Sequence, residues 1–167
     1  MKPIILILGG SSTIAKALAT LHKDDEVFYS YHSLFENAEN AFYLDLYDIQ
    51  TYHNIPVKTY DVIYSFLGFT PSLDLIEDLN TSKATIERNF LYPTLVLQFL
   101  ILNKRVKSNT RIKVITSVAG VRGRKLNYVY GASKSGIQTI VEGLANKYSH
   151  LKFTDIVLGP VLTDAVP

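Results

Sequence analysis

Short runs of apolar residues alternate along the chain with longer segments in which apolar residues recur every three or four positions. The short runs predict six β-strands, at Ile4–Leu8, Glu26–Tyr31, Ala41–Leu46, Asp61–Phe66, Ile112–Ser117 and Phe153–Leu158. The longer segments predict helices at Ile14–His22, Ser82–Lys104 and Val129–Tyr148. Parallel strands need crossover connections, and these connections place helices on the faces of the sheet. The order therefore predicts one doubly wound α/β domain over residues 1–167, with helices on both faces of a parallel sheet.

The longest helical pattern, Ser82–Lys104, contains a proline at position 93. Proline has no backbone N–H group, so it removes one hydrogen bond from the interior of a helix. We therefore expect Pro93 to kink this helix or to begin a new turn within it.

Composition excludes several classes of protein. The 17 Lys and Arg residues against 15 Asp and Glu give a net charge of only +2, so we expect no nucleic-acid partner. The longest apolar stretch, Phe90–Leu102, is shorter than the roughly 20 residues of a membrane helix, so we expect no membrane span. The absence of cysteine excludes disulfides and thiolate metal sites and fits a reducing compartment, so the cytoplasm is the expected location.

A run of small residues follows the first predicted strand, Gly9-Gly10-Ser11-Ser12-Thr13-Ile14-Ala15. Binding a dinucleotide at this place requires a tight turn, close approach to the pyrophosphate and a helix N-terminus that attracts anions. Gly9 suits the turn and Ala15 suits close packing of the helix, whereas Thr13 stands where a glycine is common. An ordinary strand-to-helix turn capped by serine or threonine is the alternative interpretation.

The end of the second predicted strand carries no carboxylate. NAD sites often place an acidic residue there to bind the ribose hydroxyls. Here the segment reads Phe28-Tyr29-Ser30-Tyr31-His32-Ser33, in which His32 or Ser33 is a candidate contact for a 2′-phosphate. The pattern favours NADP over NAD, although NAD stays possible. The alternative interpretation of His32 is a solvated loop residue.

Tyr130 and Lys134 are separated by one helical turn, and Ser117 ends the strand that precedes them. Residues at i and i+4 share one face of a helix, so the Lys134 ammonium can lie near the Tyr130 phenol. A free tyrosine is a poor acid or base at neutral pH, and a neighbouring cation favours its ionised form. The three residues therefore form a candidate acid–base site, whereas each taken singly has an ordinary structural explanation.

Together these residues resemble the single-domain branch of the short-chain dehydrogenase/reductase family, whose sheet is of the Rossmann type. Gly9, Thr13 and Ala15 stand at the three positions of the family's glycine-rich turn. Asp45 and Leu46 match the acidic residue and its neighbour that lie near the adenine in the family. The resemblance covers almost the whole chain.

Three later segments match the family's pattern to different degrees. Where the family has Asn-Asn-Ala-Gly, this chain has Ser65-Phe66-Leu67-Gly68, so only the glycine matches. The family's Pro-Gly-Pro-Val-x-Thr run corresponds to Leu158-Gly159-Pro160-Val161-Leu162-Thr163. The family's four catalytic residues all have counterparts in order and spacing, namely Asn89, Ser117, Tyr130 and Lys134.

The resemblance implies hydride transfer between NADPH and a small carbonyl or alcohol substrate. Tyr130 would protonate the carbonyl oxygen, Lys134 would hold the nicotinamide ribose, Ser117 would bind the substrate oxygen, and Asn89 would hold a water molecule. Thr163 would contact the nicotinamide carboxamide. The implied cofactor contacts are Gly9, Ser11, Ser12, Thr13, Ile14, His32, Asp45, Leu46, Gly68, Tyr130, Lys134 and Thr163.

The resemblance also implies self-association. In the family, helices corresponding to Ser82–Lys104 and Val129–Tyr148 form subunit interfaces. The first of these carries many apolar residues, including Leu95, Leu97, Phe99, Leu100 and Ile101, so we expect a homodimer or homotetramer. The family continues beyond the position of Pro167 with a substrate-covering segment and a seventh strand, and both are missing from this sequence.

Three interpretations of function stay open. The first is an NADP-dependent reductase. The second is a cofactor-binding or regulatory relative without turnover, suggested by the altered segment Ser65–Gly68 and the short C-terminus. The third is a nucleotide-sugar epimerase or dehydratase, which has a larger C-terminal domain and a different glycine spacing. The basic loop residues Arg122, Arg124 and Lys125 are candidate contacts for an anionic substrate or an ordinary solvated loop.

Overall fold

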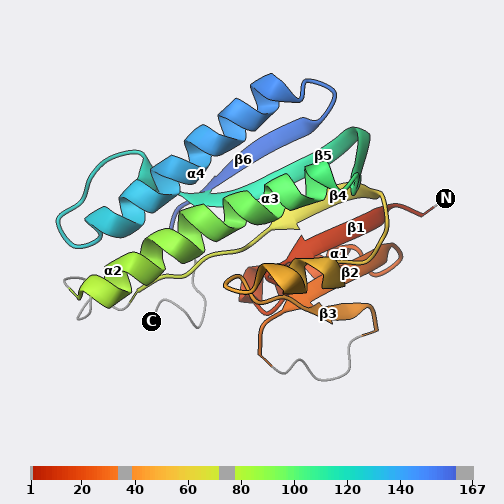
Figure 1. Cartoon of the computed structure of the whole chain (residues 1–167), viewed down its shortest axis with the longest axis horizontal. Helices are drawn as coiled ribbons and strands as arrows, with labels where there is room; N and C mark the ends of the chain where they lie inside the picture. Colours follow the sequence, from red (N-terminus) through yellow and green to blue (C-terminus); the bar gives the residue numbers. More distant parts are fainter. Residues whose placement is uncertain (1, 34–38, 72–77, 161–167) are drawn as a thin grey trace.

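The computed structural model describes residues 2–33, 39–71 and 78–160 and forms a six-stranded parallel sheet (Figure 1). The strands are β1 (Ile4–Leu8), β2 (Glu26–Tyr31), β3 (Ala41–Tyr43), β4 (Tyr60–Ser65), β5 (Val106–Ser117) and β6 (Lys152–Leu158). Their spatial order is β3-β2-β1-β4-β5-β6, and every neighbouring pair is parallel. The order reverses between β1 and β4, which is where the two halves of a doubly wound sheet meet. The predicted fold class is confirmed.

Helices cover the sheet on both faces. Leu6 and Leu8 of β1 belong to a core cluster with Val96 and Leu100 of α3 (Tyr92–Leu102) and Ile137 of α4 (Tyr128–Lys147). Both helices cross in front of the strands in Figure 1. The alternate residues of the same strand, which point the other way, pack in a second cluster with Ala15, Leu18 and Ala19 of α1 (Thr13–Leu21).

Two strands, β3 and β5, differ in length from the prediction by more than one residue. β3 ends at Tyr43 because the chain turns into the short helix η1 (Ile49–Asn54), where Thr51 Oγ1 both accepts from the Asp45 backbone N–H and donates to the Asp45 carbonyl. Leu44–Leu46 therefore follow β3 at the edge of the sheet and are not part of the strand. β5 begins six residues before the predicted start, with a register shift opposite Tyr60 and Val62. The first residues of β5 are mostly polar, so the search for apolar runs did not detect this part of the strand.

The predicted helix Ser82–Lys104 is divided into three parts, α2 (Leu79–Ile86), the π-helical turn η3 (Glu87–Leu91) and α3. Pro93 at the start of α3 has no N–H group to offer the carbonyl one turn earlier. Asn89 adds a second cause, because its side-chain amide donates to the Thr85 carbonyl at 2.9 Å. The expected new turn is therefore found, and it lies just before the proline.

The structure bears on the expected oligomer interface and on the expected absence of a membrane span. Leu97 and Leu100, which the sequence grouped with an oligomer interface, are 1% and 0% exposed and belong to the core of this chain. They stabilise the fold of the single chain and are inaccessible to a partner. Among the helices of the described residues, none has both the length and the apolar character needed to cross a bilayer.

Candidate functional site

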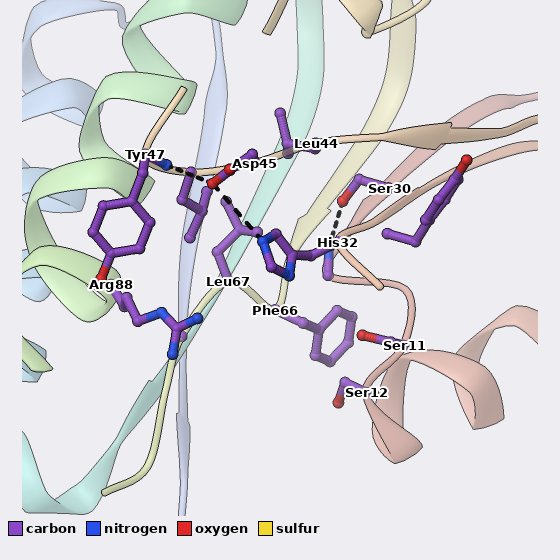
Figure 2. A pocket seen from close by; sticks show the side chains of 14 residues that line it. Ser11, Ser12, Ser30, His32, Leu44, Asp45, Tyr47, Phe66, Leu67 and Arg88 are labelled. Carbon is purple, nitrogen blue, oxygen red and sulfur yellow. Dashed lines mark hydrogen bonds and ion pairs between the residues drawn. The ribbon is translucent and has the colours of Figure 1, made fainter. Parts of the chain in front are cut away.

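A cleft of about 310 Å³ opens at the carboxyl ends of β1, β2, β3 and β4 (Figure 2). The carboxyl ends of parallel strands meet at one edge of the sheet, so the residues that follow each strand converge there. The cleft is lined by Gly9, Ser11, Ser12, Ser30, Tyr31, His32, Leu44, Asp45, Leu46, Tyr47, Phe66, Leu67, Gly68 and Arg88. Of the predicted cofactor contacts, seven therefore line one cleft: Gly9, Ser11, Ser12, His32, Asp45, Leu46 and Gly68.

One side of this cleft is the turn between β1 and α1. Gly9 has φ +78°, a left-handed conformation that glycine adopts without strain, and its N–H donates to Ser30 Oγ at 2.8 Å. A Cβ at Gly9 would lie 3.1 Å from the Phe66 backbone. Ser12 is the N-cap residue of α1, yet its side chain makes no capping hydrogen bond. The serines and the helix N-terminus are therefore available to an anion, which weakens the simple capping interpretation.

The other side of the cleft follows β2 and β3. His32 Nε2 lies 3.9 Å from Asp45 Oδ1, and the His32 ring stacks on Tyr43 with 6.0 Å between ring centroids. Asp45 Oδ1 also accepts from the Tyr47 backbone N–H at 2.9 Å. These contacts hold a carboxylate and an exposed imidazole beside each other at the mouth of the cleft.

Gly68 joins the cleft to a second group of predicted residues. A Cβ built on Gly68 would lie 2.8 Å from Asn89 Oδ1 and 3.1 Å from Lys134 Nζ. Only glycine leaves room for both side chains at this position. Asn89 is fixed in place because it accepts from the Phe69 N–H at 3.0 Å and donates to the Phe69 carbonyl at 2.6 Å.

Lys134 is a buried cation on the first half of α4. It is 6% exposed, and its Nζ lies 5.7 Å from the centroid of the Tyr130 ring. Burial lowers the pKa of Lys134 to about 8, and the negative charge of Asp155 opposes that shift. Lys134 therefore places a buried positive charge beside the Tyr130 ring.

Ser117 reaches the same region through the short helix η4 (Val118–Gly120). The Ser117 hydroxyl oxygen accepts from the Ala119 N–H at 3.2 Å, which leaves its O–H group able to donate. η4 packs against α4 where a Cβ on Gly131 would lie 2.6 Å from the Ala119 carbonyl oxygen. Absence of a side chain at Gly131 therefore brings the end of β5 against the helix turn that carries Tyr130.

This close approach gives a matched pair of substitutions in one helix. Gly131→Ala is expected to lower the free energy of unfolding by about 1–3 kcal/mol, because the new methyl group must displace backbone. Gly143→Ala has no atom within 4 Å of the added Cβ and is expected to raise it by about 0.5–1 kcal/mol. Urea denaturation of both variants measures the two effects, and a neutral Gly131→Ala would contradict the packing described here.

The remaining predicted residues lie elsewhere. Thr13 and Ile14 begin α1 and do not line the cleft. Thr163 lies outside the described residues. Arg122, Arg124 and Lys125 lie in the exposed loop between η4 and α4.

Seven residues that line the cleft were not predicted as contacts, and of these Tyr47 and Arg88 lie outside the strand-end segments that the sequence singled out. Both are immediate neighbours of residues that the sequence did select, Leu46 and Asn89. Their types carried no signal, because tyrosine and arginine are common on surfaces. Position next to a selected residue was the only clue.

Comparisons with known proteins bear on the family and the fold of this chain. A family model described as short chain dehydrogenase matches residues 69–167. An uncharacterized oxidoreductase from Mycobacterium tuberculosis is 29% identical over 91 residues, which cover 54% of this chain and 36% of that protein. The matched region is thus little more than a third of the length of that relative.

Two solved structures share the fold. A short chain dehydrogenase family protein from Francisella tularensis has a TM-score of 0.82 and 23% identity, and the match covers 99% of this chain and 72% of that chain. A short chain dehydrogenase from Burkholderia cenocepacia in complex with NADP has a TM-score of 0.82 and 13% identity, with coverage of 98% and 75%. The family model spans more than half of the sequence, and on that ground the chain belongs to the short chain dehydrogenase family.

Proposed function

We propose that the protein is an oxidoreductase that transfers hydride between NADPH and a small carbonyl or alcohol substrate. The observation that carries the proposal is the position of Gly68, which lines the cleft and at the same time adjoins Asn89 and Lys134. A dinucleotide in the cleft would therefore reach the side chains suited to proton transfer. The cleft fits such a cofactor, since it combines an uncapped helix N-terminus, a glycine turn and a polar rim.

In this proposal each residue has a defined task. Bound NADPH supplies hydride to the carbonyl carbon. Tyr130 donates its proton to the carbonyl oxygen, and the Lys134 ammonium stabilises the phenolate that is left. Ser117 donates a hydrogen bond to the same oxygen where negative charge develops. The phenolate regains a proton from solvent, and the reverse sequence oxidises an alcohol.

The altered segment Ser65–Gly68 does not block the cleft. Phe66 and Leu67 line it with apolar side chains, and the one glycine shared with the family stands beside Lys134. This arrangement supports cofactor binding, which both interpretations require. The reductase is preferred over a relative without turnover because all four candidate catalytic residues are present, Asn89, Ser117, Tyr130 and Lys134. A homodimer or homotetramer and a cytoplasmic location stay predictions.

A titration with NADPH and with NADH, followed by cofactor fluorescence, tests the cofactor. We expect both to bind and NADPH to bind more tightly, because β2 ends without a carboxylate and His32 is exposed at the cleft. His32→Ala is expected to weaken NADPH binding about three- to tenfold and to leave NADH binding unchanged. Absence of binding by both cofactors would remove the basis of the proposed function. Binding without oxidation of NADPH by any of a broad panel of aldehydes and ketones would favour the inactive relative.

A further inference from the structure

Arg88 lies at the opposite side of the cleft from Ser11 and Ser12 (Figure 2). It comes from the π-helical turn η3, one residue before Asn89. The resemblance to the family assigns it no role. π-Turns interrupt the regular helix register and are frequent at functional sites. This one places an arginine on the wall of the cleft next to Leu67, as the close view shows.

Two aromatic rings hold the Arg88 guanidinium. Its central carbon lies 5.1 Å from the centroid of the Phe69 ring and 5.8 Å from that of Tyr47. Tyr47 packs in turn on Tyr92, with 4.8 Å between ring centroids. A guanidinium this close to an aromatic ring is attracted to it at a gain of roughly 0.5–2 kcal/mol, so the position of the side chain is restricted while Arg88 still lines the cleft.

The backbone beneath this stack is also fixed. Asn89 both accepts from the Phe69 N–H and donates to the Phe69 carbonyl, at 3.0 and 2.6 Å. It also donates to the Thr85 carbonyl within the same helical segment. Arg88 and its stacking partner Phe69 are therefore tied to each other through the neighbouring asparagine. The wall of the cleft is preorganised at this point.

No carboxylate pairs with Arg88 among residues 2–33, 39–71 and 78–160. An arginine without a carboxylate partner on the wall of a cleft suits two kinds of ligand, an anion or a flat aromatic ring. The groups that suit phosphate are the serines and the N-terminus of α1, which lie across the cleft from Arg88. The base of a dinucleotide would lie away from those groups, on the side of Asp45, Leu46 and Arg88.

We propose that Arg88 binds the adenine base of the cofactor by stacking the cleft-facing side of its guanidinium on the ring, and so contributes equally to the affinity for NADPH and NADH. This inference rests on the proposed function, since it assigns a contact to the same cofactor. It also separates two tasks within one cleft. His32 distinguishes the two cofactors by the 2′-phosphate, and Arg88 holds the base that they share.

The test compares Arg88→Met and Arg88→Lys with the unchanged protein in titrations with NADPH, NADH, AMP and reduced nicotinamide mononucleotide. Methionine keeps the apolar stem and removes the charge and the plane, whereas lysine keeps only the charge. Stacking predicts that both variants lose about five- to thirtyfold in affinity for NADPH, NADH and AMP. The affinity for reduced nicotinamide mononucleotide, which has no adenine, is expected to stay the same. Arg111→Met, an exposed arginine on β5 outside the cleft, is the matched control and is expected to bind all four as before.

Each other outcome overturns the inference in a recognisable way. A loss confined to NADPH, or rescue by Arg88→Lys, would indicate a phosphate contact made by charge alone. Unchanged affinities in both variants would remove Arg88 from cofactor binding and leave the proposed function intact. Failure of the unchanged protein to bind any of the four ligands would overturn the inference and the proposed function together. Urea denaturation of both variants verifies that they are folded, and loss of folding in both would show that Arg88 acts in stability instead.

Discussion

Tyr130→Phe is expected to lower turnover about 10²–10⁴-fold while cofactor affinity stays within about twofold. The substitution removes one oxygen atom and keeps the ring against which Lys134 Nζ lies at 5.7 Å. The proton that the carbonyl oxygen needs then has no donor at this position. Binding depends on the cleft, whose lining does not include Tyr130. The effects on chemistry and on binding should therefore separate.

Tyr128→Phe is the matched control for this prediction. Tyr128 begins the same helix, two residues before Tyr130, and its side chain is 51% exposed. The same oxygen is removed from the same turn of α4, and we expect turnover to change less than twofold. The measurement is NADPH oxidation with an aldehyde or ketone found active with the unchanged protein. Normal turnover in Tyr130→Phe would contradict the role given to this tyrosine.

The order of strands and helices was predictable because burial on both faces leaves a continuous apolar run in each central strand. Ile4–Leu8 is such a run, and the structure gives β1 the same bounds. The start of β5 was not predictable in this way, since Lys107, Ser108 and Asn109 are exposed. That part of the strand is held by backbone pairing with β4 and by the bond from Thr110 Oγ1 to the Tyr60 carbonyl. Contacts between segments that are distant in the sequence leave no pattern in the local sequence from which the strand could be predicted.

The candidate site shows the same division. The glycine turn, His32 and Asp45 follow strand ends, and parallel strands bring their ends together, so their convergence followed from the predicted fold. Arg88 was not predictable, because its direction depends on the register of η3. That register results from Pro93 together with the hydrogen bond that the Asn89 side-chain amide donates to the Thr85 carbonyl, and this hydrogen bond is visible only in three dimensions.

The same burial that suits Lys134 to its proposed task should destabilise the fold. An ammonium that is 6% exposed has lost most of its hydration, and its pKa falls from 10.5 to about 8 even with Asp155 opposing the shift. Between these two values the unfolded chain binds more protons than the folded chain. The free energy of unfolding therefore rises with pH across this window, and the destabilisation is full below pH 8. Residues at functional sites commonly reduce stability in this manner.

Lys134→Met is accordingly expected to stabilise the chain at pH 7 by about 3 kcal/mol and at pH 10 by only about 1 kcal/mol. Methionine preserves the apolar length of the side chain and carries no charge to desolvate. The measurement is the free energy of unfolding in urea at several pH values for the variant and the unchanged protein, without cofactor. The difference between the two proteins isolates Lys134 from the other groups that titrate.

Lys147→Met controls for the general effect of replacing a lysine of α4. Lys147 is exposed at the last turn of the helix, so its replacement should change the free energy of unfolding by less than about 0.5 kcal/mol. Lys134→Met could instead destabilise the chain at pH 7. That result would mean that the contacts of the ammonium stabilise the fold by more free energy than its burial costs. The lysine would then hold the cleft and α4 together as a structural residue. A stabilised but inactive variant would show that this position is kept for chemistry at the expense of stability.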